Sequence, residues 1–113
     1  MQRPSSSSVR VLYPDFDRGE LLAKLRNGVA RLEPLVPLRS VVLFGSWARD
    51  RQTAASDIDL LVIYEGPSRD DVYRLVRKTI GLRGLEPHVY TVDEAASLAP
   101  TIERMTAGGI TIH

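Results

Sequence analysis

The stretches VVLFGSWARD (residues 41–50) and SDIDLLVIY (residues 56–64) decide the fold of this chain. Residues 41–44 form a short apolar run that ends at a glycine, which is typical of a strand covered on both faces. Residues 58–64 form a second apolar run, and the polar residues 50–56 between the two predict a loop. We therefore expect two core strands on either side of one loop.

The second strand opens with two acidic residues, Asp57 and Asp59. Because successive side chains of a strand alternate between faces, both carboxylates project from the same side. Two carboxylates so close together repel each other and need a cation or strong hydrogen-bond donors beside a core. Mg²⁺ prefers oxygen ligands and commonly binds one or two carboxylates together with substrate phosphates. The pair therefore predicts a divalent-cation site.

The first strand ends in Gly45 and Ser46, which offer a site for a phosphate. Glycine lets the backbone approach a phosphate, and Ser46 can cap a short helical turn whose free amides and positive dipole end attract anions. Arg49, one turn later, carries a planar guanidinium that can neutralise phosphate charge. Each half alone is commonly a plain turn or a solvated strand start. Their combination predicts a site for a metal-bound nucleoside triphosphate.

This combination resembles the signature of the DNA polymerase beta-like nucleotidyltransferase superfamily, and in particular its minimal nucleotidyltransferases. The resemblance is carried by GSWAR (residues 45–49), by the ten residues between Ser46 and Asp57, and by SDIDLLV (residues 56–62). It covers residues 17–113. It implies an enzyme that transfers a nucleoside monophosphate, AMP from Mg-ATP, to a hydroxyl acceptor with loss of pyrophosphate.

The resemblance also implies a third carboxylate on a later strand, which completes a set of three acids around one or two Mg²⁺ ions. Glu86 is the candidate because it opens the third expected strand. Asp93 and Glu94 are weaker candidates, because helix capping explains their place after that strand. By similarity, Asp57 and Asp59 bind the metal and triphosphate, and Glu86 helps activate the attacking hydroxyl. The chain departs from the family at Glu86, where aspartate is more frequent, and at Asp50, where glycine is frequent. His88 shares a strand face with Glu86 and can sit near the site, but a single histidine is more often structural.

A partner chain is a further implication of the resemblance. Minimal nucleotidyltransferases of prokaryotes are commonly paired with a HEPN-domain protein as the antitoxin of a toxin-antitoxin module, and some modify a tyrosine of that toxin with AMP. The expected sheet and helices account for nearly every residue, so we expect the acceptor to come from another chain. The alternative is a non-catalytic binding module that neutralises such a partner by complex formation. The oligomeric state stays open, a homo-oligomer included.

The segments around the two core strands complete an α+β fold, a small mixed β-sheet with helices packed against it. Apolar residues at three- and four-residue intervals predict helices, and Asp17 is the expected cap of the first. The expected elements are a helix from Asp17 to Pro34, a helix that Ser68 caps and Gly81 ends, a strand at 85–91, a short helix at 92–98 that Pro100 terminates, a helical turn at 101–106 and an apolar stretch at 110–112.

The composition bounds these expectations. The chain has 113 residues, of which 43% are hydrophobic and 26% charged, so we expect one domain at residues 9–113 behind a disordered tail at 1–8. Residues 9–13 are expected to form either a short edge strand or coil. A formal charge of +1 does not favour binding to a long nucleic acid. No apolar run is long enough to span a bilayer, and there is no cysteine. A cytoplasmic location is therefore expected.

Overall fold

A computed structural model describes residues 16–53 and 55–113. The expected tail at 1–8 and strand at 9–13 lie outside these ranges. The elements in chain order are α2 (Arg18–Leu32), β1 (Leu38–Phe44), β2 (Ile58–Tyr64), α3 (Val72–Ile80), β3 (Leu85–Thr91), α4 (Val92–Ser97), α5 (Ala99–Thr106) and β4 (Ile110–Thr111). The expected α+β class is confirmed.

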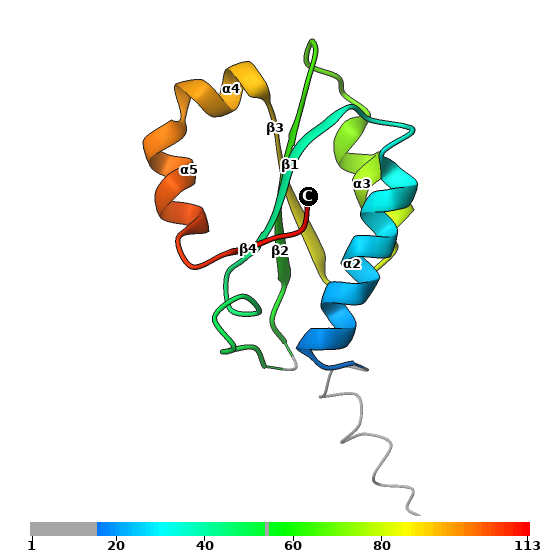
Figure 1. The fold of residues 1–113 in the computed structure, drawn as a ribbon, viewed down its shortest axis with the longest axis vertical. Coiled ribbons are helices and arrows are strands. Elements are labelled where there is room, and N and C mark those ends of the chain that lie inside the picture. The colour runs from blue at the N-terminus through cyan, green and yellow to red at the C-terminus, as the bar shows by residue number, and fades with distance from the viewer. Residues whose placement is uncertain (1–15, 54) are drawn as a thin grey trace, which may run out of the picture.

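The strands form one mixed sheet in the order β3-β2-β1-β4. Strand β1 is antiparallel to both β2 and β4, whereas β2 and β3 are parallel. Helices α2 and α3 lie on one face of the sheet, and α4 and α5 lie on the other (Figure 1). Strand β3 is an edge strand, which explains why Pro87 can stand within it.

The core lies between the sheet and the pair α2 and α3. Leucines 21, 25 and 32 of α2 are fully buried and belong to one cluster with alternate residues of the strands, among them Leu43 and Leu60. Each such side chain contributes about 1.5–3 kcal/mol when it leaves water. Every residue of α4 and α5 is described, and none is buried. Because Asp59 alternates with Leu60, its carboxylate projects to the less covered face of the sheet.

The start of α2 is capped as the sequence predicts. The Asp17 carboxylate accepts a hydrogen bond from the backbone N–H of Glu20 (2.8 Å), and the Glu20 carboxylate accepts one from the backbone N–H of Asp17 (2.9 Å). This reciprocal pair is a capping box and satisfies amides that the first turn leaves free. The guanidinium of Arg18, the first residue of the helix, then donates to the carbonyl of Ala48 (2.9 Å). The capped end of α2 thus supports the loop that follows β1.

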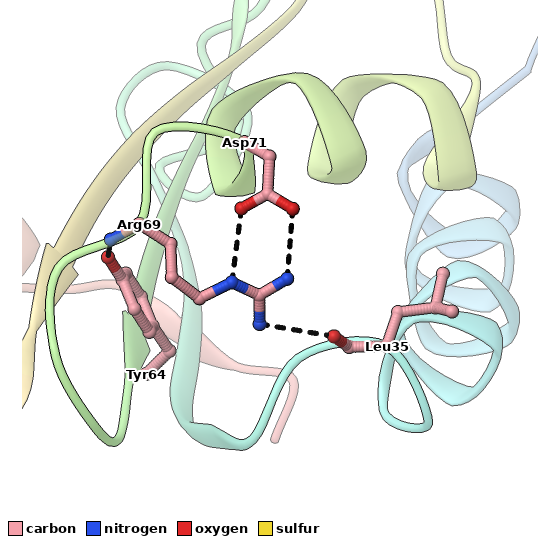
Figure 2. A network of polar contacts seen from close by, with 4 residues as sticks. All are labelled: Leu35, Tyr64, Arg69 and Asp71. Carbon is pink, nitrogen blue, oxygen red and sulfur yellow. Dashed lines mark hydrogen bonds and ion pairs between the residues drawn. The ribbon is translucent and has the colours of Figure 1, made fainter.

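Helix α3 begins at Val72, so the expectation that Ser68 caps it is wrong. Figure 2 shows the reason. The Arg69 guanidinium forms two hydrogen bonds with the Asp71 carboxylate (both 3.0 Å) and a third with the carbonyl of Leu35 (3.3 Å), while the Arg69 backbone N–H donates to the Tyr64 hydroxyl (2.8 Å). These contacts hold the residues before Asp71 in a loop, and Asp71 becomes the residue that precedes the helix.

We expect Asp71→Asn to destabilise the protein near neutral pH. The hydrogen bond from Arg69 lowers the pKa of the Asp71 carboxyl. A carboxyl whose folded pKa lies below its unfolded value, about 3.9, stabilises the fold above that value and loses this contribution as the pH falls through the folded pKa. The melting temperatures of wild type and variant should therefore differ at pH 7 and converge below about pH 4.

Thermal denaturation across pH tests this expectation. Glu65→Gln is the matched control, because it breaks the Arg39–Glu65 pair (3.5 Å), whose side chains are 64% and 56% exposed. That variant should change stability less at pH 7. A gap between wild type and Asp71→Asn that stays constant across pH would contradict the assignment.

Two other boundaries differ from the sequence-based expectation. Strand β1 begins at Leu38, three residues earlier than its apolar run, because Leu38 pairs with Tyr64 at the far end of β2. Helix α4 ends at Ser97, before Pro100, as expected. The helical turn expected at 101–106 is the longer helix α5, which begins at Ala99 with Pro100 in its first turn, where a proline removes only an amide that has no helical partner. Within the described ranges no helix is both long and apolar enough to cross a membrane.

Candidate active site

The site is built where β1 ends beside the start of β2. Phe44 pairs with Asp59 across the two strands, and Gly45 follows with a positive φ of 78°. A Cβ atom at Gly45 would lie 3.2 Å from Cγ of Asp59 and would overlap Oδ2 of the same carboxylate. Glycine is therefore required at position 45 for two reasons: its backbone is in the left-handed region, and the Asp59 carboxylate occupies the space that a side chain would need. The structure brings these two predicted site residues together.

The loop after Gly45 is one hydrogen-bonded turn, as expected. The backbone N–H of Arg49 donates to the carbonyl of Gly45 (3.2 Å), and that of Arg51 donates to the carbonyl of Ser46 (2.8 Å). Arg49 is thus the first residue of the turn whose backbone N–H donates within it. The backbone N–H of Ser46 is not used to close the turn. Ser46 is half-buried and Arg49 is exposed, so both can face a ligand.

Trp47 anchors this turn to the hydrophobic core. Its side chain is only 2% exposed and belongs to the core cluster, with its ring centroid 5.8 Å from that of Phe16. The turn is therefore held on one side by an aromatic contact and on the other by the Arg18–Ala48 hydrogen bond. A loop tied at two points keeps its amides oriented, which lowers the cost of ordering them around a phosphate.

The carboxylate expected from the third strand is less simply placed. Glu86 pairs with Asp59 across the parallel strands β2 and β3, but its carboxylate accepts a hydrogen bond from the hydroxyl of Tyr73 in α3 (3.2 Å). The side chain that reaches Asp59 from β3 is that of His88, whose Nε2 lies 3.3 Å from Asp59 Oδ1. The two-residue spacing from Glu86 places His88 on the same face of the strand, but the sequence alone does not show its contact with Asp59.

The donor atoms present fit a divalent cation. Asp57 is exposed just before β2 and Asp59 is half-buried, so both offer carboxylate oxygens. In the part of the chain that the structure describes, no three acidic, histidine or cysteine side chains lie together as a complete metal cage. A cation would therefore have to draw the side chains of the site together, and phosphate oxygens and water would supply its remaining ligands.

Comparison with known proteins agrees with this geometry. Residues 22–107 match the family described as Nucleotidyltransferase domain. The chain belongs to this family. The match contains the whole site, from the turn after Gly45 through the acidic strand to His88, and the nucleotidyltransferase fold expected from the sequence is thereby confirmed.

Individual relatives of this nucleotidyltransferase are more distant. A protein of Methanocaldococcus jannaschii, named provisionally as a protein adenylyltransferase, is 40% identical over 48 residues, which are 42% of this chain and 49% of the relative. The match thus spans about half the length of that protein. A crystal structure from Sulfolobus solfataricus, of a protein named provisionally as a nucleotidyltransferase, has a TM-score of 0.59 and 21% identity to this chain. The similarity covers 83% of this chain and 80% of that one. A chain of a toxin-antitoxin structure with AMP-PNP has a TM-score of 0.56 and 19% identity, and the similarity covers 78% of this chain and 72% of that one.

Asp50 ends the turn in an unusual backbone conformation for a residue with a side chain. Its φ is 58°, in the left-handed region that glycine adopts at little cost. The glycine that the family resemblance implies at this position would adopt this conformation at lower cost. Asp50 holds it at an energetic cost.

We expect Asp50→Gly to be more stable than Asp50→Ala by about 1 kcal/mol, because alanine pays the full penalty of the left-handed region and glycine does not. Asp50 is exposed, so neither substitution removes a packed side chain. Urea denaturation of the two variants measures the difference directly. Equal stabilities would show that the loop relaxes out of this conformation.

Proposed function

We propose that this nucleotidyltransferase transfers AMP from Mg-ATP to a hydroxyl group of a partner protein. The observation that carries the proposal is the close approach of Gly45 and Asp59. It supports a site in which the turn after Gly45 binds phosphate beside a carboxylate that holds a cation. Family membership supports nucleotidyl transfer as the class of reaction. The name of the M. jannaschii relative, a protein adenylyltransferase, supports a protein as acceptor.

The proposed reaction needs alignment and charge neutralisation more than covalent help from the protein. The acceptor oxygen attacks the α-phosphorus, the new oxygen–phosphorus bond forms as the α–β anhydride bond breaks, and pyrophosphate leaves. Amides of the turn after Gly45 and the Arg49 guanidinium orient the phosphates. One or two Mg²⁺ ions held by Asp57 and Asp59 would neutralise charge that develops on the phosphates. Glu86 is the proposed acceptor of the hydroxyl proton.

The partner that we propose is a HEPN-domain toxin, with this chain as its antitoxin. Support comes from a structural neighbour that belongs to a toxin-antitoxin complex and was crystallised with AMP-PNP. Within residues 16–53 and 55–113 the sheet and its four helices form one unit, and we propose that the acceptor comes from another chain. A tyrosine hydroxyl of the toxin is the proposed acceptor.

Labelled ATP tests the proposal. The chain is incubated with Mg²⁺ and the product of the neighbouring gene, using ATP labelled at either the α- or the γ-phosphate. Nucleotidyl transfer leaves the α-label on the partner protein and releases the γ-label as pyrophosphate. Label from the γ-phosphate on the partner would contradict the reaction class, because it indicates phosphoryl transfer.

The second candidate function is a binding module that neutralises its partner without chemistry. It is favoured by the contacts of the Glu86 carboxylate, which is hydrogen-bonded to Tyr73, while His88 makes the contact to Asp59. A stable complex of the two chains that forms equally well without ATP and Mg²⁺, with no label transferred, would decide for the binding module.

A further inference from the structure

We infer that His88, and not Glu86, supplies the third protein ligand of the cation held by Asp57 and Asp59, and that its nitrogen biases the site toward Mn²⁺. The inference rests on the proposed metal-nucleotide site and adds a ligand that the sequence pattern did not assign. The metal then has a nitrogen ligand in addition to carboxylate oxygens, and the metal ligand on β3 is His88 in place of Glu86.

The first support is the position of the His88 ring. His88 pairs with Leu61, two residues beyond Asp59 on the parallel neighbour strand, so it shares the sheet face of Asp59. Its Nε2 lies 3.3 Å from Asp59 Oδ1, and the two side chains are 32% and 28% exposed. A small movement of either group lets both bind one cation, since ligand atoms of a hard cation lie about 2–2.5 Å from it.

The second support is the restraint on the ring. The imidazole lies against Phe44, with ring centroids 4.9 Å apart and an interplanar angle of 60°. Phe44 itself is buried and pairs with Asp59. Packing against a fixed neighbour restricts the rotamers of His88, which is the preorganisation that a ligand needs. Asp57, exposed at the start of the strand, is then the ligand that must move to complete the set.

The third support is the placement of Glu86. Its carboxylate is hydrogen-bonded to the hydroxyl of Tyr73, which belongs to α3. Helix α3 packs on the sheet face opposite to the one from which Asp59 projects (Figure 1). The Glu86 carboxylate is therefore engaged by Tyr73, whereas the contact to the Asp59 carboxylate from β3 is made by His88. His88 is thus the side chain of β3 that is placed for the metal.

A ligand set of two carboxylates and one imidazole has a predictable preference. Mg²⁺ strongly favours oxygen ligands, whereas Mn²⁺ tolerates the same octahedral surroundings and accepts imidazole as well. We therefore expect His88→Asp, which restores an all-oxygen set, to lower the ratio of Mn²⁺ to Mg²⁺ affinity by about tenfold.

Spin-echo spectroscopy of Mn²⁺ bound with inorganic tripolyphosphate tests the inference without relying on activity. Tripolyphosphate contains no nitrogen, and the chain has two histidines, His88 and His113. We expect nitrogen modulation typical of a directly bound imidazole in the wild type and in His113→Gln, and its loss in His88→Gln. His113 is a matched control because its Nδ1 lies 3.4 Å from Glu33, in a pair outside the site.

Two results separate this inference from the proposed function. Mn²⁺ that stays bound when Asp57 and Asp59 are both replaced by asparagine would overturn the metal site itself. Mn²⁺ that requires both aspartates but shows no imidazole modulation in the wild type would overturn only the role of His88. The His88→Asp selectivity measurement covers the case in which His88→Gln does not fold, and an unchanged affinity ratio there also counts against the inference.

Discussion

Asp59→Asn is expected to lower the rate of AMP transfer by at least about a thousandfold, because it removes the charge that holds the cation against the triphosphate. Asparagine has nearly the shape of aspartate, so the space beside Gly45 stays filled and the fold is retained. The measurement is the initial rate of α-label transfer to the partner protein at saturating ATP and Mg²⁺.

Asp93→Asn is the control for this substitution. Asp93 is an exposed acid in the first turn of α4, outside the site, and transfer should be unchanged within experimental error. A rate for Asp59→Asn within tenfold of the wild type would show that Asp59 is not the main metal ligand.

Gly45→Ala is expected to be the most damaging single substitution of an uncharged residue. It forces a side chain into the left-handed region at about 1–2 kcal/mol. It also places a methyl group against the Asp59 carboxylate, which adds about 1–3 kcal/mol of overpacking and displaces the ligand. We therefore expect a loss of several kcal/mol of unfolding free energy together with loss of metal-dependent nucleotide binding.

Gly108→Ala separates the two costs of that substitution. Gly108 has nearly the same φ, 77° against 78° for Gly45, and a Cβ atom there would meet nothing within 4 Å in the described structure. Its variant should pay only the backbone penalty and keep nucleotide binding. Equal destabilisation of the two alanine variants would mean that the close approach of Gly45 and Asp59 has no energetic consequence.

The parts of the fold that the sequence predicts correctly are those determined by local chemistry. The spacing of the leucines and the Asp17 cap define α2, and the apolar run after Asp57 defines β2 with its observed bounds. Gly81 ends α3 in the left-handed conformation that glycine favours. In each case the residues that decide the element lie within or next to it.

The errors arise where distant contacts decide. Helix α3 starts late because Arg69 binds both Asp71 and the carbonyl of Leu35, a residue 34 positions away. The Glu86 carboxylate is directed by a tyrosine hydroxyl from α3, which no pattern within β3 reveals. The side-chain contact between His88 and Asp59 depends on the parallel register of β2 and β3. The alternation of side chains along β3 predicts only the sheet face on which His88 lies.

The central claim is that Gly45, Ser46, Asp57 and Asp59 bind a nucleoside triphosphate together with a divalent cation. Calorimetric titration of the chain with a non-hydrolysable ATP analogue tests it most directly, in Mg²⁺ or Mn²⁺ and again after chelation of the metal, with Asp59→Asn in parallel. We predict binding by the wild type that requires the metal and is lost in the variant. Binding that is as tight without metal, or as tight in Asp59→Asn, would contradict the claim.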